Sequence, residues 1–122
     1  MIRFITGGAR SGKSTFAEEL YKDRKDVVYI ATAKIWDQEM EERVRLHQET
    51  RPREWRTFEG NYDLHKAVED EKHYLLDCLT VLTSNIMFNL SGQLDYIDYD
   101  LQGKIENTVL MEVENLIKKI ND

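Results

Sequence analysis

The sequence predicts an α/β domain in which helices flank a parallel β-sheet. Short apolar runs rich in β-branched and aromatic residues alternate with longer amphipathic stretches, a pattern typical of parallel sheets. The length of 122 residues suits one compact domain, and hydrophobic residues make up 41% of the chain. A glycine-rich loop also lies between the first apolar run and the first amphipathic stretch. We therefore expect a single domain over residues 1–122.

Four apolar runs predict β-strands. The first ends at a pair of glycines, and the last ends in an aspartate. Their length and composition are typical of buried strands. The expected strands are Ile2–Thr6, Val27–Thr32, Trp55–Phe58 and Tyr74–Asp77.

Five segments predict helices: 13–21, 37–50, 62–68, 81–90 and 101–120. The last carries an apolar stripe at helical spacing, formed by Ile105, Val109, Val113, Leu116 and Ile120. Pro52 should end the second helix. The sequence stops on the last helix, whereas a parallel chain normally returns to the sheet. We therefore expect the domain to be incomplete at its C-terminus and to lack its last strands.

Composition excludes several classes of protein. With 17 Lys and Arg against 23 Asp and Glu, the net charge is −6, which disfavours a nucleic-acid partner. No stretch approaches the roughly 18 apolar residues that would span a membrane. Cys78 is the only cysteine, so no intrachain disulfide can form. These features favour a cytoplasmic protein.

The glycine-rich loop fits the pattern G-x-x-x-x-G-K-[ST] of a phosphate-binding loop. Its backbone N–H groups and the following helix N-terminus would hold phosphates, and the lysine would reach the β- and γ-phosphates. The serine hydroxyl would bind Mg²⁺. The alternative is an ordinary glycine turn before a helix. The residues that match are Gly7, Gly8, Ala9, Arg10, Ser11, Gly12, Lys13 and Ser14. This loop predicts a fold like that of P-loop nucleoside triphosphate hydrolases.

A second Mg²⁺ ligand is expected at the end of a buried strand. Asp77 follows Tyr74-Leu75-Leu76, which is the setting of the metal-binding aspartate in P-loop proteins. Many strands end in Asp for other reasons, because this residue also favours turns and caps. Given the phosphate loop, we favour the metal-binding interpretation.

The predicted helix over 37–50 carries a histidine between two arginines. Arg43, His47 and Arg51 are spaced four residues apart and would share one helix face. Guanidinium groups would bind phosphates and disfavour protonation of the imidazole, and a neutral imidazole can act as a nucleophile. On spacing alone, a solvated histidine on a charged helix is the more common explanation. Glu59, which follows a predicted strand, could accept a hydrogen bond from a donor group of a ligand, or it could be an ordinary turn residue.

Several segments together identify a known family. They span nearly the whole chain up to about Asn89, and the block from His47 to Glu59 is more specific than the phosphate loop. The residues that carry the resemblance are Thr6–Ser14, Ala17, Glu18, Tyr29–Ala33, Asp37, Glu39, Met40, Arg43, His47, Arg51, Pro52, Trp55–Thr57, Glu59, Leu75–Thr80, Ser84 and Asn85. With these residues, the chain resembles the bifunctional adenosylcobinamide kinase / adenosylcobinamide-phosphate guanylyltransferase family of cobalamin biosynthesis.

The resemblance implies two reactions. A nucleoside triphosphate, ATP or GTP, phosphorylates adenosylcobinamide, and GMP then passes from GTP through a histidine to adenosylcobinamide phosphate. His47 would be the guanylylated nucleophile, and Lys13 would stabilise charge on the phosphates. The resemblance also implies that Thr32, Ala33, Arg51 and Glu59 lie near the nucleotide. Ser14 and Asp77 would hold Mg²⁺.

Two other functions remain compatible with the sequence. The chain could be a P-loop kinase of small molecules in which His47 is incidental, or a nucleotide-binding module without full catalytic activity. Members of the family are distinctly longer and assemble as oligomers, which admits a homo-oligomer for this chain.

Overall fold

The computed structural model describes residues 2–6, 12–32, 38, 41–42, 45–46, 49, 51–92 and 97–122. Three parallel strands form the described sheet: β1 (Val27–Ala31), β2 (Arg56–Glu59) and β3 (His73–Asp77). Their order in the sheet is β2-β1-β3, so β1 is central. Each strand begins within two residues of its predicted start, which confirms these three predictions.

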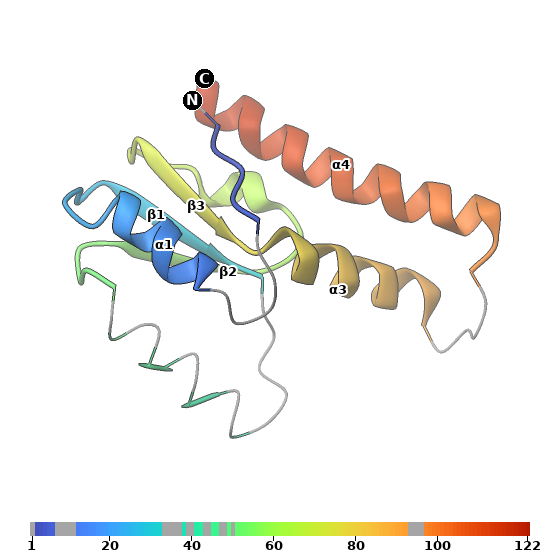
Figure 1. The fold of residues 1–122 in the computed structure, drawn as a ribbon. Helices are drawn as coiled ribbons and strands as arrows, with labels where there is room; N and C mark the ends of the chain where they lie inside the picture. Colours follow the sequence, from blue (N-terminus) through green and yellow to red (C-terminus); the bar gives the residue numbers. More distant parts are fainter. Residues whose placement is uncertain are drawn as a thin grey trace.

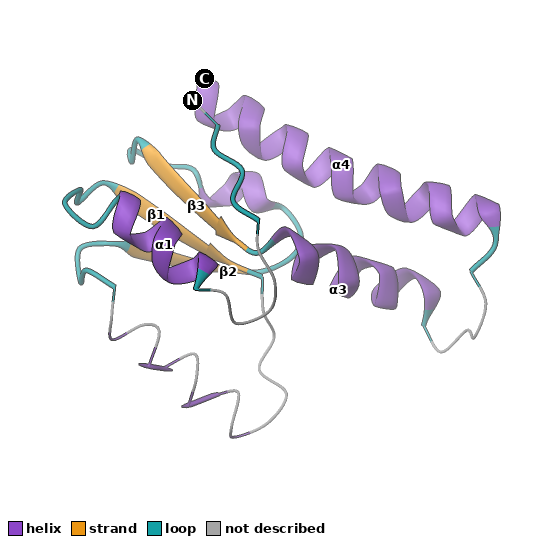
Figure 2. Ribbon diagram, viewed as in Figure 1, coloured by secondary structure: helices purple, strands orange, loops and turns teal. Residues whose placement is uncertain are grey.

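Helices cover both faces of this sheet (Figures 1 and 2). Helix α1 (Lys13–Leu20) lies against one face and contacts β3. The short 3₁₀ helix η1 (Leu64–Ala67) and the helices α3 (Leu79–Ser91) and α4 (Tyr99–Asn121) pack together on the other. The parallel α/β fold predicted from the sequence is thereby confirmed.

The hydrophobic core lies between the sheet and the layer formed by η1, α3 and α4. Val28 and Ile30 alternate with residues of the opposite face, so both point into this core. The side chains that meet them come from all three helical elements. They include Leu64, Ala67, Leu82, Ile86 and Leu116.

Helix α4 confirms the predicted apolar stripe. Ile105 and Leu116 are buried, and Val109, Val113 and Ile120 are the partly buried members. The helix begins two residues earlier than predicted because Asp98 caps it, its side chain accepting a hydrogen bond from the Leu101 N–H at 2.8 Å. No helix among the described residues is long and apolar enough to cross a membrane.

The predicted strand over Ile2–Thr6 is wrong. The segment is extended without strand pairing, and Ile2 and Phe4 are 74% and 75% exposed. It lines a pocket together with β3. Strand formation depends on pairing with neighbouring strands as well as on composition, and within the described part of the chain this segment pairs with none of β1, β2 and β3.

The predicted helix over 37–50 is described only in part. The residues with helical backbone are Gln38, Glu41, Glu42, Arg45, Leu46 and Glu49, and the rest of this range lies outside the described residues. After Arg51 the helical backbone has ended, as Pro52 predicts.

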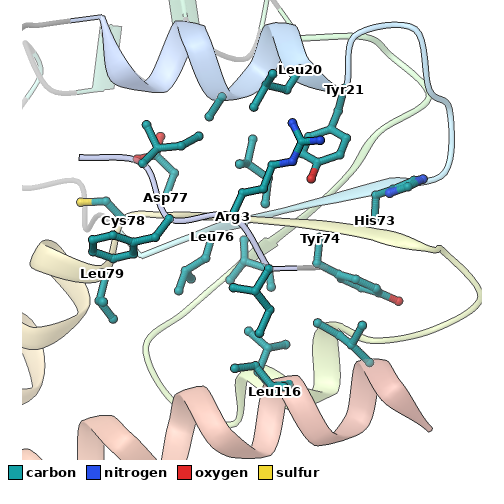
Figure 3. A pocket seen from close by; sticks show the side chains of 18 of the residues that line it. Arg3, Leu20, Tyr21, His73, Tyr74, Leu76, Asp77, Cys78, Leu79 and Leu116 are labelled. Atoms are coloured by element: carbon teal, nitrogen blue, oxygen red, sulfur yellow. The ribbon is translucent and has the colours of Figure 1, made fainter. Parts of the chain in front are cut away.

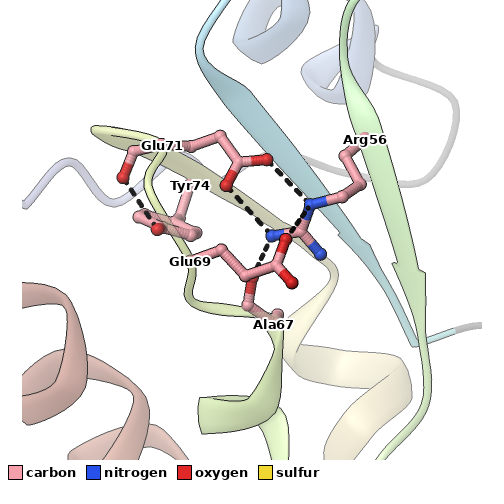
Figure 4. A network of polar contacts seen from close by, with 5 residues as sticks. All are labelled: Arg56, Ala67, Glu69, Glu71 and Tyr74. Carbon is pink, nitrogen blue, oxygen red and sulfur yellow. Dashed lines mark hydrogen bonds and ion pairs between the residues drawn. The ribbon is translucent and has the colours of Figure 1, made fainter.

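An ion-pair network fixes the amino end of β2 beside the loop that leads into β3 (Figure 4). The Arg56 guanidinium donates to both carboxylate oxygens of Glu71, at 2.7 and 3.1 Å, and to the Ala67 carbonyl oxygen. Its Nε also lies 3.1 Å from Glu69. The Tyr74 hydroxyl donates to the Glu71 carbonyl oxygen at 2.7 Å. The network therefore joins η1, β2 and β3.

Candidate functional site

The carboxyl ends of the three strands bring two of the predicted site residues together. In the strand register, Ala31 pairs with Glu59 of β2 on one side and with Asp77 of β3 on the other. Ala31 thus separates the two acidic residues at one edge of the sheet. Ligands of open parallel sheets bind at this edge, outside the carboxyl ends of the strands.

The start of α1 faces the same region. Gly12 precedes the helix with a φ of 83°, a left-handed conformation that glycine adopts without strain. Lys13 is the first helical residue, and it lines a pocket of about 680 Å³ together with Asp77. Figure 3 shows this pocket between α1 and α4, with β3 running across it and Asp77 on the side of α1. The fold therefore places the predicted phosphate-binding lysine and the predicted metal-binding aspartate around one pocket.

Thr32 is fully buried and ties β1 to the end of β3. Its Oγ1 donates to the Cys78 carbonyl oxygen at 2.8 Å and accepts from the Cys78 N–H at 2.9 Å. The Thr32 carbonyl oxygen accepts from Asn85 Nδ2 at 3.0 Å, and the same nitrogen lies 3.2 Å from Asn61 Oδ1. These bonds hold the turns after the three strands to α3.

Arg51 is 9% exposed and packs on the strand face that also carries Asp77. Its guanidinium carbon lies 3.7 Å from the centroid of the Tyr29 ring, in the geometry of a cation–π contact. The Tyr29 hydroxyl donates a hydrogen bond to Asp77 Oδ2. Tyr29 therefore contacts two of the predicted site residues.

Electrostatics keep the Tyr29 hydroxyl protonated. Burial raises its pKa most, followed by the hydrogen bond to Asp77. The charges of Asp77 and Glu18 raise the pKa further, and the Arg51 guanidinium opposes them. The raised pKa keeps the hydroxyl protonated at neutral pH, where it donates to the carboxylate.

Several predicted site residues lie outside the described part of the chain. These are Gly7, Gly8, Ala9, Arg10, Ser11, Ala33 and His47. Of the others, Thr32, Glu59 and Asp77 lie at one edge of the sheet, at or just after the ends of the strands. Arg51 is buried against the Tyr29 ring. Ser14 is the second residue of α1.

The sequence interpretation gave no role to Tyr29, Asn61 or Asn85. A signal for Tyr29 was available, because a tyrosine within an otherwise aliphatic buried strand usually needs a partner for its hydroxyl. The partner itself could not be identified, since Tyr29 and Asp77 are 48 residues apart.

The donor set at this edge fits Mg²⁺ better than a softer metal. Mg²⁺ takes hard oxygen ligands, and in nucleotide sites it is bound by one or two protein oxygens together with phosphates and water. The Asp77 carboxylate supplies oxygens of this kind, and Tyr29 donates a hydrogen bond to its Oδ2. Among the described residues, there is no group of three His, Cys, Asp or Glu side chains that could hold a metal ion by themselves.

A parallel α/β sheet, a Gly-Lys-Ser helix start and a strand-end aspartate together define a P-loop type of nucleotide-binding protein. Comparison with known families is more specific. The family model described as cobinamide kinase / cobinamide phosphate guanyltransferase matches residues 3–122. The chain belongs to this family.

Curated relatives agree with this assignment. The chain is 39% identical over 121 residues to the bifunctional adenosylcobalamin biosynthesis protein CobU of Escherichia coli, and 38% identical to CobU of Salmonella typhimurium. Each alignment covers 96% of this chain and 66% of the relative. The corresponding protein CobP of Pseudomonas aeruginosa is 42% identical over 92 residues, which cover 71% of this chain and 53% of that protein. The chain thus spans slightly less than two thirds of the length of the two CobU relatives and about half of that of CobP.

Proposed function

We propose that the chain catalyses the phosphorylation of adenosylcobinamide and the transfer of GMP from GTP to adenosylcobinamide phosphate, in cobalamin biosynthesis. The observation that carries this proposal is the family match over residues 3–122, which includes both the phosphate loop and the His47 block. The pocket shared by Lys13 and Asp77 supports it, because phosphoryl transfer needs a cation and a metal-binding carboxylate at one place.

In the kinase step, a hydroxyl oxygen of adenosylcobinamide attacks the γ-phosphorus of a nucleoside triphosphate, ATP or GTP. The nucleoside diphosphate leaves, and the hydroxyl proton is released to water. Lys13 and the backbone N–H groups of Gly7–Gly12 would bind the phosphates. Mg²⁺ bound by the Ser14 hydroxyl and the Asp77 carboxylate would supply further positive charge at the phosphates. Positioning and charge stabilisation account for most of the catalysis in this class of reaction.

In the guanylyl step, a ring nitrogen of His47 attacks the α-phosphorus of GTP, and pyrophosphate leaves. A phosphate oxygen of adenosylcobinamide phosphate then attacks the same phosphorus, and the bond from phosphorus to nitrogen breaks. The product is adenosylcobinamide-GDP, and His47 is regenerated. The histidine divides one transfer into two displacements, as covalent catalysis does generally. Thr32, Ala33, Arg51 and Glu59 would bind the nucleotide.

Trapping the covalent intermediate tests the guanylyl step. The protein is incubated with Mg²⁺ and α-³²P-GTP, denatured, and examined for label that is labile in acid and stable in alkali. We expect label in the wild type and in the control His65→Ala, and none in His47→Ala. Measurable GTP binding without any label would instead support a nucleotide-binding module without full activity.

The kinase step needs a separate assay. Transfer of label from γ-³²P-ATP or γ-³²P-GTP to adenosylcobinamide should be lost in Lys13→Ala and retained in His47→Ala. Kinase activity with no covalent guanylyl label would favour a P-loop kinase in which His47 is incidental.

We also propose a cytoplasmic location, where both nucleoside triphosphates are available.

We further propose that the protein is a homo-oligomer. Exposed apolar side chains on α3 and α4 support self-association: Phe88, Leu110 and Met111 are 60%, 58% and 60% exposed. Light scattering of the purified protein measures the assembly directly, and a monomeric mass at assay concentration would contradict it.

A further inference from the structure

Tyr29 occupies a position between two groups of the proposed site. It lies in the middle of the central strand and is 6% exposed. Its hydroxyl donates to Asp77 Oδ2, and its ring lies under the Arg51 guanidinium, 3.7 Å from centroid to carbon. One side chain thus contacts both the expected metal-binding carboxylate and an expected nucleotide-binding guanidinium.

The strand register explains why Tyr29 can do this. Tyr29 pairs with Leu75 of β3, and Ala31 pairs with Asp77. Alternate residues of a strand face the same side, so Tyr29, Leu75 and Asp77 share the sheet face opposite the core. The long phenol side chain extends toward the carboxyl edge and reaches the carboxylate two residues beyond its own partner. A shorter side chain at this position could not span that distance.

We infer that Tyr29 is a positioning residue that holds the Asp77 carboxylate through its hydroxyl and supports the Arg51 guanidinium through its ring. The inference rests on the proposed function and deepens it. Carboxylates that bind metals are commonly oriented by a hydrogen bond from a neighbouring side chain, and loss of that bond weakens metal binding. A guanidinium on a buried aromatic face is held by the negative face of the ring.

The two contacts can be separated by substitution. Tyr29→Phe removes only the hydroxyl and leaves the ring under Arg51, whereas Tyr29→Leu removes both. Tyr74→Phe is the matched control, because it removes the hydroxyl of a partly buried tyrosine of the neighbouring strand, which donates to the Glu71 carbonyl oxygen. That bond lies at the opposite end of the sheet (Figure 4).

Metal binding is measured by electron paramagnetic resonance of Mn²⁺, as a probe for Mg²⁺, with the full chain and a non-hydrolysable GTP analogue. We expect Tyr29→Phe to raise the Mn²⁺ dissociation constant by about tenfold, at the lower end of the losses known for such partners. Binding of the analogue in EDTA should stay within about twofold of wild type, because the ring still supports Arg51. Tyr29→Leu should weaken binding in EDTA as well, by about three- to fivefold. Tyr74→Phe should change neither quantity.

A double-mutant cycle distinguishes positioning from a general structural effect. If Tyr29 acts through Asp77, Tyr29→Phe should cause no further loss of Mn²⁺ affinity in an Asp77→Asn background. Additive losses, or unchanged Mn²⁺ affinity in a folded Tyr29→Phe protein, would overturn the role of the hydroxyl while leaving the proposed function intact. Unchanged binding of Tyr29→Leu in EDTA would overturn the role of the ring. If the wild type binds no nucleotide, both the proposed function and this inference fail.

Discussion

Thr32 and Cys78 exchange two hydrogen bonds beyond the last pair of the β1–β3 ladder. The Thr32 hydroxyl donates to the Cys78 carbonyl oxygen at 2.8 Å and accepts from the Cys78 N–H at 2.9 Å. The Thr32 N–H also donates to the Asp77 carbonyl oxygen at 3.2 Å. The bonds of the Thr32 side chain continue the connection between β1 and β3 past the last backbone pair, and together these bonds hold the backbone of Asp77 and Cys78 in place.

Replacement of the Thr32 hydroxyl tests this link. Thr32→Val keeps the shape of the side chain but leaves the Cys78 N–H without its partner, whereas the Cys78 carbonyl oxygen still accepts from the Leu82 N–H. The substitution should therefore destabilise the protein by about 1–3 kcal/mol. The control is Thr83→Val, whose exposed hydroxyl donates only to the Leu79 carbonyl oxygen within α3. Its free energy of unfolding should stay within about 0.5 kcal/mol of wild type. Urea denaturation measures both, and equal effects of the two substitutions would contradict the argument.

The ion pair of Arg56 with Glu71 should make stability depend on pH. The hydrogen bond from Arg56 lowers the pKa of Glu71 below its ordinary value of 4.5. A lowered folded-state pKa means that the contribution is complete above the unfolded pKa and is lost as the pH falls through the folded pKa.

Comparison of wild type with Glu71→Gln measures this dependence. The difference in unfolding free energy should be largest near about pH 7 and should shrink between about pH 5 and pH 3. Glu69→Gln is the matched control, because the Glu69 side chain is 63% exposed against 19% for Glu71. Its effect should be smaller at every pH, since exposed ion pairs contribute little. A pH-independent effect of Glu71→Gln would exclude the ion pair as its cause.

Helix α4 caps the 3₁₀ helix from a distance of about fifty residues in sequence. The Glu112 carboxylate accepts from the backbone N–H groups of Asp63 and Leu64 at 3.0 and 3.2 Å. Glu112→Ala removes the acceptor of both donors, of which the Asp63 N–H is exposed to solvent, so we expect the loss of about 0.5–2 kcal/mol that is typical of a helix cap. Glu114→Ala changes the same residue type at an exposed position of the same helix and should be nearly neutral. The prediction fails if the two variants unfold at the same urea concentration.

Substitution of alanine for two glycines, Gly12 and Gly103, should change the stability of the protein in opposite directions. Gly12 has a φ of 83°, where a side chain is strained by about 1–2 kcal/mol, so Gly12→Ala should destabilise the protein. Gly103 lies within α4, and a Cβ built there meets no atom within 4 Å. Gly103→Ala should therefore stabilise the protein by about 0.5–1 kcal/mol. Thermal unfolding followed by circular dichroism measures both shifts, and shifts of the same sign would contradict the assignment of Gly12.

The sequence by itself determined the elements that local patterns encode. A run rich in β-branched residues predicted β1, and a short apolar run ending in an aspartate predicted β3. The 3.6-residue period of the stripe from Ile105 to Ile120 predicted α4, because burial on one face depends on spacing along the chain. The same reasoning placed Lys13 at a helix start and Asp77 at a strand end.

The tertiary structure alone decided which strands pair and which side chains from distant parts of the sequence are in contact. The segment Ile2–Thr6 has the composition of a strand, but whether it pairs depends on which strands lie beside it, and composition does not specify them. The contacts of Tyr29 with Asp77 and Arg51 likewise follow from strand order and register. These long-range relations are set by which faces pack together, and the sequence carries no periodic signal for them.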